Sequence, residues 1–180
     1  MNFKKDFPGI IVSVFGEDHQ LSKQSETFLN LLCFEFIKII VKKSNDLLNP
    51  IDYEKQIVNK SIKKRLTTRE IETSIQLLFP KEIVDYLIKS YKNVVYYKSK
   101  IFFSESVTEN IIQKYILNNV KITKNSIKFL AFLTETLVYD ILSSFGDIVN
   151  DTTITKKGLS KVFKENKELK EILKVLKVSI

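Results

Sequence analysis

Residues 63–83 read KKRLTTREIETSIQLLFPKEI, and this stretch sets the interpretation of the whole chain. Thr67 and Glu70 have the spacing of a capping box, in which hydroxyl and carboxylate each accept from a free backbone N–H group. A helix is therefore predicted to begin here, because the apolar residues that follow recur three or four positions apart. Pro80 ends this helix and can open another. The stretch thus predicts a basic loop, a short capped helix and a second helix.

The composition favours an ordered, mostly helical protein. The 180 residues include only 4 glycines and 3 prolines, and 44% of them are hydrophobic, which suits one compact domain or two very small ones. The net charge of +8 favours an anionic partner, with nucleic acid ahead of a membrane surface, while charge that only maintains solubility is the alternative. Cys33 is the only cysteine, so no disulfide can form within the chain and a reducing compartment is expected.

Two apolar segments bear on membranes and secretion. The longest apolar run, residues 28–41, contains Asn30, Glu35 and Lys38, and it is too short to span a bilayer. The patch at residues 10–14 lacks the apolar region and cleavage site of a secretory signal. We therefore expect neither a membrane partner nor secretion.

Hydrophobic periodicity predicts two long helices. The first is capped by Ser22 or Ser25 and runs to about Leu48, and the second covers about residues 125–149. The first is apolar around most of its circumference, so it must be enclosed on several sides. Further helices are predicted at residues 7–15, 80–97, 106–117 (with a capping box formed by Ser106 and Glu109), 155–165 and 167–176.

The two halves of the chain repeat each other. SETFLNLL at 25–32 matches SIKFLAFL at 126–133, an offset of 126 − 25 = 101 that also pairs Phe36 with Leu137. After the long helices the offset falls to 154 − 66 = 88, so the difference of 101 − 88 = 13 indicates a longer loop in the first half, around residues 50–61. Each half is a short, a long and a short helix with an extra helix behind.

This repeat predicts how the halves are arranged. A long helix that is apolar nearly all round cannot be covered by two short helices of its own unit, whereas two units that cross at their long helices cover each other. The sequence therefore predicts an all-α protein in which units 1–98 and 104–180, joined by a linker at 99–103, form one intramolecular pair.

The chain resembles the core histones over nearly its whole length. LTTREIETSIQLLFPKE at 66–82 resembles the second loop, third helix and start of the C-terminal helix of histone 2B. TETLVYDIL at 134–142, with Gly146, resembles the long helix of histone 2A, and ENKELKEIL at 165–173 resembles its C-terminal helix. This order is similar to that in the histone doublets of giant DNA viruses. The resemblance implies two tandem histone folds that form an intramolecular handshake pseudo-dimer.

The resemblance also implies a function. A doublet of this type would bind DNA without sequence specificity and compact it as the histone 2B/2A-type part of a nucleosome-like particle. Its partners would be double-stranded DNA and a histone 4/histone 3-type doublet or tetramer, and it would lie on chromatin in the host nucleus or viral factory and in the virion. The alternative is a histone-fold protein-interaction module of a transcription or chromatin complex that does not wrap DNA.

The implied DNA contacts lie where the first loop of one half meets the second loop of the other, and where the short first helices of the two halves converge. One end comprises Lys121, Thr123 and Lys124 beside Lys63, Lys64, Arg65, Thr67 and Thr68, and the other comprises Ser22, Lys23 and Gln24 beside Thr152, Thr153, Lys156 and Lys157. The chemistry agrees, because helix N-termini and hydroxyls donate to phosphate and Lys or Arg neutralises it. Arg65 is a candidate for the minor groove, whereas Arg69 could be structural; residues 63–65 could also be a solvated loop.

Several departures from the histone pattern limit these contacts. Thr153 stands where histone 2A has an arginine, in a shortened loop, so the DNA contact there should be weaker. We expect no long basic tails and no segment for docking on the histone 3 and histone 4 pair, which leaves attachment to such a tetramer open. Of the acidic patch that recruits chromatin factors, the residues that remain are Glu82, Glu135, Asp140 and Glu168.

The sequence offers little for catalysis. It has no paired His or Cys set for a metal, no Gly-rich phosphate loop, and no Ser, His and Asp set beyond chance. We therefore expect no enzymatic activity, no cofactor, no metal and no small-molecule substrate. His19, which has no Cys or His partner, is expected to be exposed, and Glu35 is expected to be buried and paired with a Lys or Arg of the other half.

Overall fold

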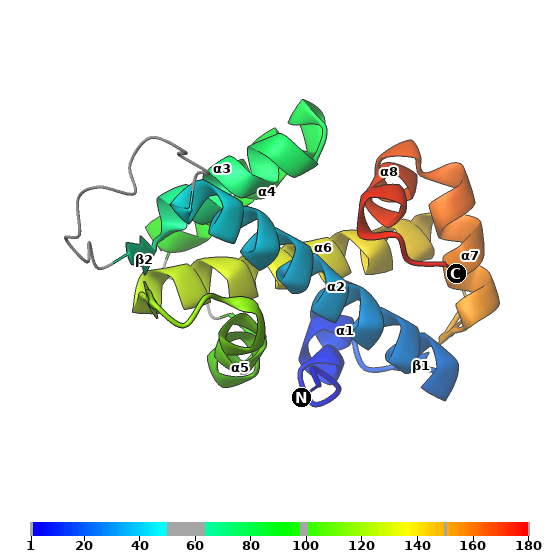
Figure 1. Cartoon of the computed structure of the whole chain (residues 1–180). Coiled ribbons are helices and arrows are strands. Elements are labelled where there is room, and N and C mark those ends of the chain that lie inside the picture. Colours follow the sequence, from blue (N-terminus) through cyan, green and yellow to red (C-terminus); the bar gives the residue numbers. More distant parts are fainter. Residues whose placement is uncertain (1, 50–63, 98–100, 150, 180) are drawn as a thin grey trace, which may run out of the picture.

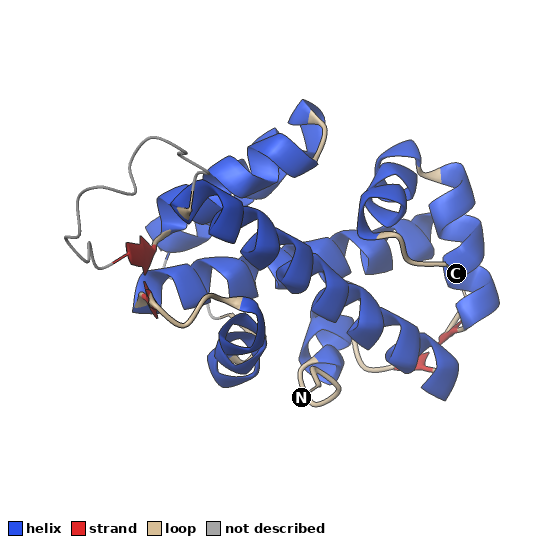
Figure 2. Ribbon diagram, in the orientation of Figure 1, coloured by secondary structure: helices blue, strands red, loops and turns tan. Residues whose placement is uncertain are grey.

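The structure is a computed structural model that describes residues 2–49, 64–97, 101–149 and 151–179, and it is mostly helical, with four very short strands (Figure 2). The predicted helices are all present. In chain order the elements are α1 (Phe7–Phe15), β1 (Gln20–Leu21), α2 (Lys23–Leu48), β2 (Lys64–Leu66), α3 (Thr68–Leu78), α4 (Lys81–Tyr97), α5 (Glu105–Tyr115), β3 (Val120–Ile122), α6 (Lys124–Ile148), β4 (Thr153–Ile154), α7 (Lys156–Glu165) and α8 (Lys167–Leu176).

The N-terminal caps of α2 and α3 follow from local sequence. Thr67 and Glu70 form the predicted capping box, in which the Glu70 carboxylate accepts a hydrogen bond from the Thr67 N–H at 2.8 Å. Ser22, rather than Ser25, caps α2, because its hydroxyl accepts from the Ser25 N–H at 3.2 Å. The predicted loop at 50–61 lies outside the described residues.

The cap predicted for α5 was wrong. Ser104, not Ser106, is the N-cap residue, and its hydroxyl accepts from the Val107 N–H at 3.3 Å. The Ser104 N–H itself donates to the Asp6 carboxylate at 3.1 Å. The N-cap residue of α5 therefore lies two positions before the one that the Ser106 and Glu109 spacing suggested, and it contacts the first half.

The two long helices, α2 and α6, cross and contact each other near the middle of the molecule (Figure 1). Besides α3 of its own half, α2 packs against α5, α7 and α8 of the other half. In the same way α6 packs against α1, α3 and α4 of the first half, as well as α5 and α7. Each long helix is therefore covered by both halves, as its nearly continuous apolar surface requires.

The repeated residues occupy equivalent buried positions. Phe28 and Phe129 are 5% and 2% exposed, and Phe36 and Leu137 are 0% and 2% exposed. Ring contacts join the halves, since Phe28 on α2 meets Phe163 on α7 with centroids 5.8 Å apart. The offsets read from the sequence thus mark structurally matched core positions.

Among the residues that the structure describes, one helix, α6, is long and apolar enough to cross a membrane by length and composition, a property that the apolar runs of the sequence did not indicate. Of its apolar 18-residue window, 67% is buried inside the protein. Burial in the core accounts for this composition, because a helix enclosed on all sides is apolar all round.

The described part of the predicted linker is packed against both halves. Phe103 is buried, and its ring stacks on Phe3 with centroids 4.5 Å apart. The backbone N–H groups of Phe102 and Phe103 donate to the Glu135 carboxylate of α6 at 2.6 and 2.8 Å. Since Asp6 is the N-cap residue of α1 and Ser104 that of α5, the hydrogen bond between them brings the N-termini of these two helices together.

Two predictions about single polar residues were wrong. Glu35 pairs with Lys38 of its own helix at 2.8 Å, rather than with a cation of the other half. His19 is half-buried, with its ring stacked on Phe15 at a centroid distance of 4.4 Å. Both partners are neighbours along the chain, so neither contact required the other half.

Candidate nucleic-acid interface

A parallel two-stranded ribbon joins the halves at one end of the molecule. β2 pairs with β3 in a register that places Arg65 opposite Lys121 and Leu66 opposite Ile122. Leu66 is fully buried and anchors the ribbon, whereas Arg65 and Lys121 are exposed. Two cations from different halves therefore sit side by side on the surface.

Two helices begin directly after this ribbon. Thr67 caps α3 and Thr123 caps α6, and the Thr123 N–H donates to the Leu66 carbonyl at 3.2 Å. Lys124, in the first turn of α6, is exposed. Adjacent helix N-termini present a partial positive charge, and together with the exposed cations they suit phosphate.

Not every predicted contact residue at this end is free to donate. The Thr67 hydroxyl donates to the Glu70 carboxylate at 2.5 Å, so its proton is already engaged. Burial alone would raise the pKa of Glu70, but hydrogen bonds from the Thr67 hydroxyl and N–H and the nearby Arg69 guanidinium hold it below its ordinary value. Glu70 is therefore a carboxylate held in its charged form, and Thr67 acts as a cap rather than a phosphate donor.

The basic run before α3 is divided between two environments. The Lys64 ammonium is half-buried and donates to the Asn49 side-chain carbonyl at the end of α2. Lys63 lies outside the described residues, and Thr68 is half-buried in the first turn of α3. Arg65 is thus the exposed cation of β2.

A second parallel ribbon joins the halves at the other end. β1 pairs with β4, which places Gln20 opposite Thr153 and Leu21 opposite Ile154. The Ser22 N–H extends the ribbon by donating to the Ile154 carbonyl at 3.1 Å. The loop expected to be shortened therefore still pairs, with Thr153 half-buried and Thr152 exposed beside it.

Three predicted residues at this end line one groove. Lys23 and Gln24, in the first turn of α2, and Lys156, in the first turn of α7, border a groove of 720 Å³ whose lining includes Phe28 and Leu31. Both lysines are exposed. Ser22 is the N-cap residue of α2, so its hydroxyl is engaged by the Ser25 N–H.

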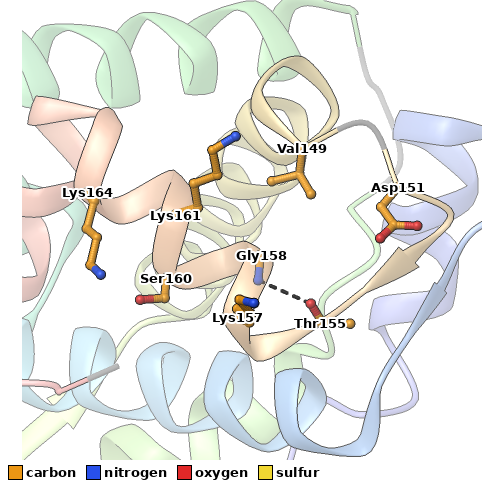
Figure 3. Close-up of a pocket in the computed structure, with 8 residues that line it drawn as sticks. All are labelled: Val149, Asp151, Thr155, Lys157, Gly158, Ser160, Lys161 and Lys164. Atoms are coloured by element: carbon orange, nitrogen blue, oxygen red, sulfur yellow. Dashed lines mark hydrogen bonds between the residues drawn. The ribbon is translucent and has the colours of Figure 1, made fainter.

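The remaining predicted lysine of this end, Lys157, lines a second groove, along α7. Thr155 and Lys157 border it together with Lys161 and Lys164, and it holds 390 Å³ (Figure 3). The Thr155 hydroxyl accepts from the Gly158 N–H at 3.1 Å. The sequence analysis did not name Lys161 and Lys164. These lysines follow Lys157 by four and seven residues, a spacing that would have placed all three on one helix face.

The meeting point of α1 and α5, between the two ribbons, is acidic. Burial raises the pKa of Asp6, an effect that the hydrogen bond from the Ser104 N–H opposes. Burial also raises the pKa of Glu135, opposed by the N–H groups of Phe103 and Phe102, while the Asp6 charge adds to the rise. Two carboxylates thus accept from the backbone just before and at the N-cap of α5, and their charge disfavours phosphate there.

The predicted remnant of the acidic patch is divided. Glu82 on α4 and Glu168 on α8 line one small groove of 160 Å³, which Glu171 also borders. Asp140 does not line this groove; burial raises its pKa, a hydrogen bond from the Tyr86 hydroxyl lowers it, and the Glu168 charge raises it. Glu135 instead holds the backbone of residues 102–103 and interacts with Asp6.

Comparisons with known proteins do not assign a function to this arrangement. A scan against protein-family models finds no match to the chain, and a search of curated proteins finds no relative. Within the described residues, no group of three or more His, Cys, Asp and Glu side chains could hold a metal ion. The functional assignment therefore depends on the ribbons, the helix N-termini and their cations.

Proposed function

We propose that this chain is a histone doublet, with two tandem histone folds that form an intramolecular handshake pseudo-dimer. It binds double-stranded DNA without sequence specificity and compacts it as the histone 2B/2A-type part of a nucleosome-like particle. The observation that carries the proposal is the pair of parallel ribbons, β2 with β3 and β1 with β4, which at both ends place a loop of one half beside a loop of the other.

The packing of the long helices supports this proposal. Each of α2 and α6 is covered by short helices from both halves, so neither half could bury its core alone. In the proposed doublet, the two units that must cover each other are joined in one chain. The sequence resemblance to histone 2B, followed by resemblance to histone 2A, gives the same order of units.

The proposed mode of DNA binding is contact with phosphates at each ribbon. Arg65 and Lys121 at one end, and Lys23 and Lys156 at the other, lie beside helix N-termini that provide free N–H groups. Such contacts carry no base information, so binding is independent of sequence and releases counterions. A histone 4/histone 3-type doublet or tetramer would supply the rest of the particle.

Binding and digestion experiments test the proposal. The chain is titrated against two duplexes of unrelated sequence, matched in A·T content and without A-tracts, at salt concentrations between about 50 and 200 mM. We expect equal affinities for the two duplexes and a steep, parallel fall with salt. Nuclease digestion of DNA assembled with the chain and a histone 4/histone 3-type tetramer should then leave protected fragments of one fixed size; a continuous range of sizes would exclude wrapping.

A second candidate function is a histone-fold protein-interaction module that does not wrap DNA. The specific observation in its favour is the pair of carboxylates, Asp6 and Glu135, where α1 and α5 meet, because the resemblance implies a DNA contact at this point. This alternative predicts no duplex binding near physiological salt, either alone or with a tetrameric histone partner.

A further inference from the structure

A cluster of rings and ammonium groups lies between α2 and α5. It consists of Phe34, Lys38 and Lys42 from α2, and Lys114 and Tyr115 from α5, and we refer to it as the aromatic–lysine cluster. The two rings meet edge to face, with centroids 5.7 Å apart. The ammonium nitrogens of Lys114, Lys42 and Lys38 lie 5.6, 5.8 and 6.0 Å from the Tyr115 centroid.

The position of Tyr115 is fixed through its backbone. The Asn45 side-chain amide donates to the Tyr115 carbonyl at 2.7 Å, and the side-chain carbonyl of Asn45 accepts from the Leu117 N–H at 3.4 Å. Asn45 belongs to α2, so α2 holds the end of α5 independently of the tyrosine ring. Both Phe34 and Tyr115 are half-buried, which leaves part of each ring open to solvent.

The cluster carries excess positive charge. Lys38 is paired with Glu35 at 2.8 Å, whereas the exposed Lys42 and Lys114 form no ion pair among the residues that the structure describes. The ring faces attract the ammonium groups and hold them together despite their mutual repulsion. Within the described part of the chain, two cations without a carboxylate partner therefore stand beside two half-buried aromatic residues.

This combination has the chemistry of a single-strand binding site. Unpaired bases stack on aromatic side chains, and the phosphates on either side of them bind cations. In an intact duplex the base faces are already stacked on one another, so only the phosphates could engage this cluster. The cluster also lies close to the β2 and β3 ribbon, because Leu117, held by the same Asn45, precedes β3 after a short turn.

We propose that the aromatic–lysine cluster binds unpaired nucleotides of DNA. The ammonium groups of Lys42 and Lys114 move from the rings to the phosphates, and a base takes their place against Tyr115 and Phe34. The inference rests on the proposed function only for the presence of a duplex on the neighbouring ribbon. It would allow the protein to hold an opened or single-stranded stretch beside the duplex that it binds.

The test compares binding of a labelled single-stranded oligo(dT) and of a duplex by the full chain and its Tyr115 variants. Tyr115→Leu removes the aromatic face but keeps the backbone hydrogen bonds to Asn45, and Tyr115→Phe keeps the face. We expect Tyr115→Leu to lower affinity for oligo(dT) about tenfold, as expected for one stacked base, and to leave duplex affinity within about twofold. Tyr115→Phe should bind oligo(dT) like the wild type.

A matched control and a fold check complete the design. Tyr139→Leu removes an exposed tyrosine of α6 that lies outside the cluster, and it should leave both affinities unchanged. Thermal unfolding of each variant shows whether a loss of binding comes from lost stacking or from lost structure. The double variant Lys42→Gln with Lys114→Gln is a second test of the site, because it removes the two cations and leaves the rings in place. This double variant should also weaken oligo(dT) binding more than duplex binding.

The outcomes are distinguishable. If the wild type does not bind oligo(dT), or if Tyr115→Leu binds it as well as the wild type does, the cluster is a structural contact and the inference is wrong. Equal losses for oligo(dT) and duplex would likewise overturn it. If the wild type does not bind duplex but binds oligo(dT) in a way that depends on Tyr115, the proposed function is wrong and the inference about the cluster is supported.

Discussion

Arg65 on β2 and Lys121 on β3 are register partners in a parallel ribbon, although they belong to different halves of the chain. Both side chains are exposed, while the next pair, Leu66 and Ile122, turns toward the core. The ribbon therefore fixes two cations at one surface point through backbone hydrogen bonds.

Arg65→Lys should change DNA preference without changing the number of charges. A guanidinium inserts more favourably than an ammonium into the narrow minor groove of A·T-rich DNA, because it is more weakly hydrated. We expect the wild type to prefer an A-tract duplex over a G·C-rich one in competition binding, and Arg65→Lys to lose this preference while the salt slope stays the same. Lys121→Arg is the control, and an equal preference in wild type and Arg65→Lys would place Arg65 outside the groove.

Glu70→Ala should destabilise the protein at neutral pH by about 1 kcal/mol, the usual cost of losing an N-terminal cap interaction. Because the pKa of Glu70 in the folded protein is below its ordinary value of 4.5, its stabilising contribution is complete above that value and is lost as pH falls through the folded pKa. Urea unfolding should therefore show that the difference in free energy of unfolding between Glu70→Ala and the wild type becomes smaller at acidic pH. Glu72→Ala in the same helix should stay within about 0.5 kcal/mol of wild type, and a loss that is independent of pH would contradict the capping role.

Glu135→Gln and Glu135→Ala should differ in sign. Alanine leaves the N–H groups of Phe102 and Phe103 without their acceptor and should cost about 1–2 kcal/mol. Glutamine can still accept these hydrogen bonds, and it removes a carboxylate whose pKa is raised by burial and by Asp6, so it should stabilise the protein at pH 7.

The pH dependence provides the check for Glu135. The extra stability of Glu135→Gln should be present at pH values above the raised pKa that Glu135 has in the folded protein. It should vanish as pH falls below the ordinary value of 4.5, because the carboxyl group is then neutral in both the folded and the unfolded protein. Chemical unfolding at a series of pH values measures this difference. Destabilisation by Glu135→Gln at neutral pH would show that the negative charge itself is needed.

Gly158→Ala should destabilise the protein even though alanine favours helix by about 1 kcal/mol. An added Cβ at this buried position would lie 2.5 Å from Cε2 of Phe145, whose ring is fully buried and cannot move freely. We expect a net loss of about 1–2 kcal/mol in thermal unfolding, from overpacking of the contact between α6 and α7. Ser160→Ala in the same helix is the control, and a stabilised Gly158→Ala would show that the core can adjust.

Local signals made much of the fold predictable from sequence. The caps at Ser22 and Thr67 depend on a residue within three positions, and the core positions of α2 and α6 follow from their apolar periodicity and from the repeat between Phe28 and Phe129. The cap at Ser104 is equally local, through the Val107 N–H, but it was missed because Ser106 and Glu109 have the capping-box spacing and Ser104 does not. Local spacing thus located the start of each helix but chose the wrong one of two nearby serines at α5.

The candidate site was predictable only in part. The cations that flank β2 and β3 could be named from composition and resemblance, since each lies beside a helix start. The engagement of Lys64 by Asn49, and the use of Glu135 to hold residues 102–103, depend on side chains that only the folded protein brings together. Polar side chains are satisfied by their nearest partners in space, and one sequence does not reveal those partners.

The salt dependence of duplex binding by two double variants tests the central claim most directly. Arg65→Ala with Lys121→Ala removes the exposed cations of one ribbon, and Lys23→Ala with Lys156→Ala removes those at the other end. Lys170→Ala with Lys174→Ala, on α8, is the matched control for charge. Each variant is titrated with one duplex over a range of salt concentrations.

If both ends contact the same duplex, each double variant should reduce the slope of log affinity against log salt by about 1.8, and their combination by about 3.6, because each neutralised phosphate contributes about 0.9. The control should leave the slope unchanged. If the salt slope of either ribbon variant stays at the wild-type value, the claim that DNA lies across both ends of the molecule is wrong.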